Sequence, residues 1–179
     1  IEETLIYKTD SRLPDTDADG FLDGNEVFHR YNPAGIAPGT LFESGAVKIY
    51  QGKAETSMYQ FYYPAVWSYK ETEKDLLLDA QTGEGFHVSL SFNKYEDVFL
   101  TDWLKKEFPD VTFINGITKN KLAMAQSEDQ RTVYLDMGPF VLVFVYDPGI
   151  KTQVDYLQTF QMMLNSVQLL VVALPDPAI

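Results

Sequence analysis

Cysteine is absent from the 179-residue sequence, which excludes disulfide bonds, catalytic thiols and cysteine-ligated zinc. Positive charge is also scarce, since 14 Lys and Arg stand against 26 Asp and Glu and give a net charge of −12. Nucleic acid is therefore not an expected partner, because phosphate binding requires clustered Lys and Arg. Anionic membrane surfaces are disfavoured for the same reason. The charge favours divalent cations instead.

The sequence also lacks an apolar run long enough to cross a bilayer. Its longest apolar stretches, 139–146 and 167–174, are typical of buried or terminal strands. The sequence begins at Ile1 with neither an initiating Met nor a signal peptide, so we expect it to be a piece of a longer chain. Any link to a membrane is expected through an upstream transmembrane anchor outside this segment.

The most informative stretch that is present is "PDTDADGFLDGNEV", residues 14–27. It places carboxylates at positions 1, 3, 5, 9 and 12 of a twelve-residue loop and a glycine at position 6, the ligand pattern of an EF-hand-type site. The carboxylates are Asp15, Asp17, Asp19, Asp23 and Glu26, the glycine is Gly20, and Phe21 at position 7 is expected to contribute only its backbone carbonyl.

This pattern predicts Ca2+ as the bound cofactor. Calcium takes about six to eight oxygen ligands, and alternate side chains of a tightly curled loop converge on one point. Gly20 permits the sharp turn, and Glu26 can close the shell with both carboxylate oxygens. One alternative is a solvated acidic turn, against which the register of five carboxylates argues. The other is magnesium, which a flexible loop with many oxygens disfavours.

The flanks of the loop predict only half of an EF-hand. Pro14 and the turn-forming residues before it argue against a helix that leads into the loop. The segment 26–31 can form one or two helical turns, and Asn32 and Pro33 would end them.

A short repeat precedes the loop. "ETLIYKTD" at 3–10 matches "EVFHRYNP" at 26–33 in its order of residue types, with an offset of 23 residues. The sequence therefore begins with what looks like the end of an earlier loop, of which Glu3 would be the closing ligand. Such short units depend on calcium and on their neighbours for stability.

Residues 1–35 resemble the thrombospondin type 3 repeat in the form found on bacterial surface proteins. The resemblance rests on "IYKTDSRLPDTDADGFLDGNEV", which departs from the family at Ser11, where Pro is frequent, and at Ala18, which replaces a Gly. Neither position supplies a ligand side chain. The resemblance implies an extracellular or cell-surface location and a calcium-stiffened repeat that leads to a distal domain. It also implies that Asp10 is a further candidate ligand.

After the repeat, we expect a linker and a first strand at 36–56, an α+β domain at 57–170 and a C-terminal tail at 171–179. With 45% apolar and 14% aromatic residues, the chain can build such a core. Strands are expected at 57–64, 66–71, 75–81, 85–92, 121–128, 130–137 and 140–147, and helices at 98–109 and 152–170. This order predicts an antiparallel sheet with two packed helices. Because the calcium loop lies outside the expected core, the domain is expected to fold without calcium.

The order of elements over 57–170 resembles the PsbP/Mog1-like superfamily. The matching residues are the Y-P-x-x-W element at 63–67 and the closing segment "LNSVQLL" at 164–170. The resemblance implies an accessory, binding or assembly module and transfers no catalytic residue.

The sequence therefore predicts a non-enzymatic protein that binds calcium and an unknown protein or glycan partner. The alternative is a hydrolase with a carboxylate-based active site in the α+β domain. The acidic run Glu71, Glu73 and Asp75 is its candidate, although a solvated turn explains that run more simply. His29 and His87 are expected to be ordinary surface residues.

Overall fold

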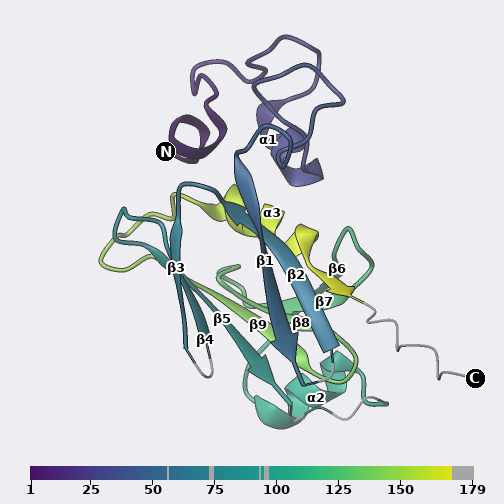
Figure 1. The fold of residues 1–179 in the computed structure, drawn as a ribbon. Coiled ribbons are helices and arrows are strands. Elements are labelled where there is room, and N and C mark those ends of the chain that lie inside the picture. Colours follow the sequence, from purple (N-terminus) through teal and green to yellow (C-terminus); the bar gives the residue numbers. More distant parts are fainter. Residues whose placement is uncertain (56, 73–74, 93, 95–96, 171–179) are drawn as a thin grey trace, which may run out of the picture.

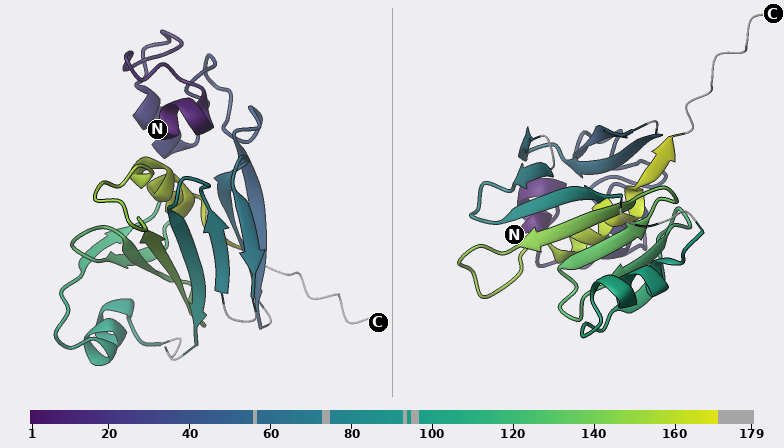
Figure 2. Two further views of the ribbon diagram at one scale, coloured as in Figure 1. Left: turned by 90° about the vertical axis from the view of Figure 1, so that its left-hand side faces the viewer. Right: turned by 90° about the horizontal axis from the view of Figure 1, so that it is seen from below.

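The computed structural model describes residues 1–55, 57–72, 75–92, 94 and 97–170 and has an α+β fold with antiparallel sheets (Figures 1 and 2). The predicted α+β class and antiparallel strand pairing are thus confirmed, although two sheets form where one was expected. The smaller sheet has the order β1 (Val47–Ala54), β2 (Ser57–Pro64) and β10 (Gln168–Leu170). The larger has the order β3 (Ser68–Glu71), β4 (Asp75–Asp79), β5 (Gly85–Ser91), β9 (Val141–Asp147), β8 (Thr132–Asp136), β7 (Ala123–Gln126) and β6 (Ile114–Ile117).

Both predicted helices are present but shorter than expected. They are α2 (Leu100–Glu107) and α3 (Leu157–Ser166). The expected helix at 152–170 was too long at both ends. At its C-terminal end the backbone becomes extended at Val167, and residues 168–170 pair with β2 as β10. At its N-terminal end a buried carboxylate fixes a non-helical loop.

That carboxylate belongs to Glu84. It accepts hydrogen bonds from Tyr146 Oη at 2.5 Å, Lys151 Nζ at 2.8 Å and the Asp155 amide at 3.2 Å. Burial alone would raise the pKa of Glu84, but these hydrogen bonds outweigh it and hold the pKa below its ordinary value. The network holds residues 151–155 in place, so α3 begins only after it.

The main core lies between the two sheets and α3. Strand alternation contributes to it: in β5, Phe86 and Val88 point inward, while His87 is exposed, as expected for that histidine. Phe86 stacks on Trp67 and on Tyr146, with ring centroids 4.6 and 4.5 Å apart. A second cluster lies under α2, where Trp103 and Leu104 pack with Ala125 and Val141. Figure 1 shows α2 at the opposite end of the molecule from the N-terminal segment.

The N-terminal segment contains two short helices, a π-helix (Glu3–Tyr7) and α1 (Asp23–His29), and both lie near α3 (Figures 1 and 2). The Tyr7 hydroxyl is 2.9 Å from Thr159 Oγ1. The Glu2 carboxylate accepts hydrogen bonds from the backbone amide and hydroxyl of Thr159, at 2.9 and 2.6 Å. Ile6, Tyr7 and Val27 are buried in the same cluster as the core of the α+β domain. The repeat and the domain therefore share one core.

The segment expected to be a linker folds back on the repeat. Tyr31 pairs with Thr40 as an isolated bridge, and the Leu41 amide donates to the Arg30 carbonyl at 3.0 Å. Leu41 is fully buried. Residues 36–41 are thus anchored against the repeat before β1 begins. None of the helices in the described part of the chain has the length and hydrophobicity to cross a membrane.

Candidate metal centre

Three aspartates of the predicted loop converge. Asp15, Asp17 and Asp19 each offer a carboxylate oxygen, and these oxygens lie within 4.8 Å of one another. This spacing is that of ligands around one ion, and the all-oxygen donor set suits a hard cation such as calcium.

The loop backbone holds these carboxylates in position. Asp15 Oδ2 accepts from the Gly20 amide at 3.0 Å, Asp17 Oδ1 from the Asp19 amide at 3.1 Å, and Asp19 Oδ1 from the Phe21 amide at 3.0 Å. The other oxygens of the first two, Asp15 Oδ1 and Asp17 Oδ2, are buried without a hydrogen-bond partner among the described residues. One oxygen of each pair therefore shapes the loop, and the second is left for a ligand.

Glu26, on α1, is not part of this group of converging oxygens, but it lies close enough for the loop carboxylates to act on its charge. Its side chain is only 3% exposed, and neither carboxylate oxygen has a hydrogen-bond partner within the described part of the chain. Burial, followed by the charges of Asp19, Asp17, Asp23 and Asp15, raises the pKa of Glu26 to about 7. Burying an unpaired carboxylate costs free energy, and a bound cation would offset that cost.

Asp23 and Phe21, two further predicted ligand positions, differ from the three converging aspartates. Asp23 is buried, but its two oxygens accept from the amide and the hydroxyl of Thr16, at 2.7 and 2.6 Å. It therefore braces the loop, and position 9 of such loops often reaches the ion through water. The Phe21 side chain is 54% exposed, as expected of a residue whose backbone carbonyl would be the ligand.

The two additional candidates lie apart from the cluster. Asp10 forms a two-point ion pair with Arg12, with contacts of 2.7 and 2.9 Å, and the guanidinium lowers the pKa of Asp10. Glu3 lies in the π-helix, and its carbonyl accepts the Lys8 amide, which ends that helix in a left-handed conformation. α1 ends in the same way at Arg30, whose amide returns to Glu26 and Val27. Both helices thus end in a left-handed residue, although these two residues are 22 positions apart and the repeat has an offset of 23.

Sequence reasoning missed the contribution of the Pro/Gly-rich segment. The Ala37 amide donates to Asp19 Oδ2 at 3.1 Å, so this segment covers one side of the loop. It also missed Thr16, although a hydroxyl residue between two ligand positions is a recognisable local signal.

Backbone strain distinguishes two positions of the loop. Gly20 has a φ of 98° and Ala18 a φ of 60°, conformations that suit glycine. We expect Gly20→Ala to lower the free energy of unfolding by about 1–2 kcal/mol. Ala18→Gly should raise it by up to about 1 kcal/mol, because the relief of strain exceeds the entropic cost of glycine. Urea unfolding in calcium checks both, and equal effects of the two substitutions would contradict these conformations.

Of the acidic run of the α+β domain, the structure describes Glu71 at the end of β3 and Asp75 at the start of β4. Glu71 accepts a hydrogen bond from the Tyr50 hydroxyl at 2.9 Å, and Asp75 begins β4. Glu73 lies outside the described residues. His29 and His87 are both exposed, and they lie on different elements.

Comparison of the chain with protein-family models, with curated proteins and with solved structures gave no match.

Proposed function

We propose that this chain is a calcium-binding, non-enzymatic part of an extracellular or cell-surface protein. In this proposal, a repeat of the thrombospondin type 3 kind presents a PsbP/Mog1-like α+β domain to a protein or glycan partner. The single observation that supports it most is the set of four buried carboxylate oxygens without a hydrogen-bond partner among the described residues: one each on Asp15 and Asp17, and both on Glu26. Such oxygens are rare in folded proteins unless an ion or water satisfies them.

The chemistry favours calcium over other cations. In this proposal the converging Asp15, Asp17 and Asp19, together with Glu26 and the Phe21 carbonyl, would supply hard oxygen ligands, and Glu26 can offer both its oxygens. The loop positions its aspartates through hydrogen bonds from its own backbone. Magnesium prefers near-ideal octahedral geometry and retains several waters, so it fits less well.

Calcium titration tests the proposal. We expect calcium to raise the melting temperature by mass action and to bind with a dissociation constant between about 10⁻³ and 10⁻⁷ M. Asp19→Ala or Glu26→Ala should remove most of this gain. Calorimetric titration and thermal unfolding with and without chelator measure both effects. Asp102→Asn, at an exposed acid on α2, is the matched control and should keep the full gain. A wild-type melting temperature that does not respond to calcium would refute the site.

A carboxylate-based hydrolase is the alternative, and Glu84 is the most enclosed carboxylate among the described residues of the α+β domain. A general base needs an oxygen that is free to accept a proton near pH 7. Glu84 instead has a lowered pKa and accepts hydrogen bonds from Lys151 and Tyr146. These contacts favour a structural role for Glu84.

A further inference from the structure

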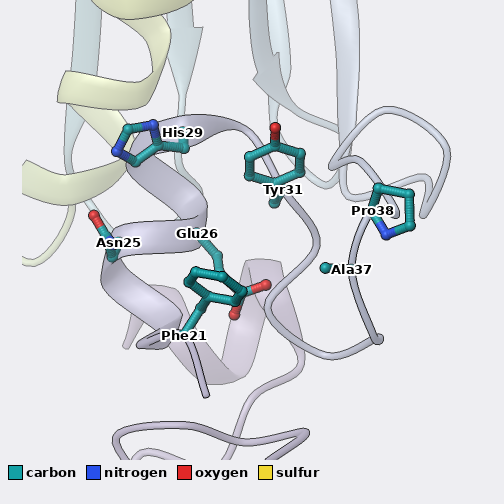
Figure 3. A pocket seen from close by; sticks show the side chains of 7 residues that line it. All are labelled: Phe21, Asn25, Glu26, His29, Tyr31, Ala37 and Pro38. Atoms are coloured by element: carbon teal, nitrogen blue, oxygen red, sulfur yellow. The ribbon is translucent and has the colours of Figure 1, made fainter. Parts of the chain in front are cut away.

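A cleft of about 350 Å³ adjoins the proposed calcium site. Figure 3 shows α1 on one side of it and the segment with Ala37 and Pro38 on the other. Phe21 and Tyr31 border the open space, and Glu26 lies beside them. Both walls are tied to prospective calcium ligands, because Glu26 belongs to α1 and the Ala37 amide donates to Asp19. A bound calcium would therefore fix the width of the cleft.

Two aromatic rings of the cleft are accessible to solvent. Phe21 is 54% exposed and Tyr31 is 44% exposed. Neither is needed as a calcium-ligating side chain, because Phe21 would act through its carbonyl and Tyr31 follows α1. Their rings are therefore free to contact another molecule.

The charge beside these rings is negative. The five loop carboxylates outweigh the two positive charges of a calcium ion together with those of Lys119 and of Arg30, which ends α1. The Lys119 Nζ lies 3.2 Å from His29 Nδ1 and 4.9 Å from the centre of the Phe28 ring. An anionic ligand would be repelled, and a positively charged one attracted.

We propose that this cleft binds an arginine side chain of a partner protein. The arginine guanidinium is permanently charged and stacks on aromatic faces, and the side chain has an apolar stem. These properties match two exposed rings beside a group of carboxylates. A neutral saccharide would gain less, because it carries no charge for the loop carboxylates to attract. The inference rests on the proposed calcium function, since calcium holds the two walls.

The test uses two peptides and calcium-saturated protein. The peptides are acetyl-Ala-Arg-Ala-amide and the same peptide with citrulline, which has nearly the same shape but no charge. Amide chemical-shift titration should show shifts centred on residues 21–38 and an affinity about threefold or more higher for the arginine peptide. Tyr31→Leu should weaken arginine binding by about threefold. Tyr69→Leu, at a tyrosine that is 49% exposed on β3, should not change it.

Calcium titration of the same samples separates the two proposals. If calcium binds but the two peptides bind equally, or if their shifts spread over the whole acidic surface, only the arginine site is refuted. Equal effects of Tyr31→Leu and Tyr69→Leu would refute it as well. If calcium does not bind, the proposed function itself fails. A wild-type-like calcium response of Tyr31→Leu shows that this variant is folded and that its loss of peptide affinity is local.

Discussion

Glu26→Gln is expected to stabilise the metal-free protein above pH 7 and to remove most of its response to calcium. In chelator above pH 7, the substitution should raise the free energy of unfolding by about 3 kcal/mol. The wild type should gain about 2.7 kcal/mol when calcium is at a hundred times its dissociation constant, and the variant, which lacks a charged ligand, should lose most of that gain. The two proteins should therefore differ strongly in chelator and little in calcium at that concentration.

The effect in chelator follows from the raised pKa of Glu26. In the metal-free protein this pKa rises from 4.5 to about 7, chiefly through burial and then through the neighbouring aspartates. At about 1.4 kcal/mol per pKa unit, ionising Glu26 in the folded protein costs about 3 kcal/mol more than in the unfolded chain. Because the folded state holds this proton more tightly, the contribution is complete below pH 4.5 and is lost as the pH rises through 7. A neutral glutamine avoids that loss.

Urea unfolding at pH 5 and pH 8, each in calcium and in chelator, measures both effects. Glu107→Gln, at an exposed glutamate on α2, is the control and should change stability little under any of the four conditions. The same proton competes with calcium, so calcium affinity should fall as the pH drops below 7. A Glu26→Gln protein that is less stable than the wild type in chelator at pH 8 would show that Glu26 is not an unpaired buried carboxylate.

The parts of the structure that the sequence could predict are local. The convergence of Asp15, Asp17 and Asp19 is specified within a few residues, because alternate carboxylates and Gly20 determine both the turn and the direction of the side chains. β5 is equally local, since the alternation of Phe86, His87 and Val88 reports which face is buried. The other four predicted carboxylates lie close enough to Glu26 to act on its charge: Asp15, Asp17, Asp19 and Asp23 raise its pKa.

The parts that could not be predicted depend on distant contacts. β10 forms because Gln168 and its neighbours find the free edge of β2, about a hundred residues earlier, and no local pattern separates this from a continuing helix. The start of α3 depends on Glu84, which lies in the turn between β4 and β5. The hydrogen bond between Tyr7 and Thr159 spans 152 residues and joins the repeat to α3.

This last contact changes what calcium is expected to do. The sequence suggested a domain that folds without calcium because the loop contributes nothing to its core. The loop itself is indeed outside the core, but Ile6, Tyr7 and Val27 on either side of it are buried in the core cluster. Calcium that stabilises the loop should therefore also stabilise α3, because these side chains pack in the same core. The free energy of unfolding of the domain should depend on calcium.

Tyr7→Ala tests this coupling without touching a calcium ligand. Tyr7 is 3% exposed, and replacing a buried aromatic residue by alanine costs about 3–5 kcal/mol. If the repeat and the domain share one core, the loss should appear in the unfolding of the α+β domain. Trp67 and Trp103 report on that unfolding by fluorescence, since both are buried in the domain.

Tyr7→Phe separates packing from hydrogen bonding. It keeps the ring and removes only the hydroxyl that contacts Thr159, so it should cost about 1 kcal/mol. Chelator should shift the tryptophan-monitored midpoint in both variants, because each still joins the loop to α3 through Val27 and Ile6. If Tyr7→Ala leaves that midpoint unchanged, the repeat and the domain unfold independently, and calcium acts on the repeat alone. Such independence would also mean that the contacts of Glu2 with Thr159 add nothing to the stability of α3.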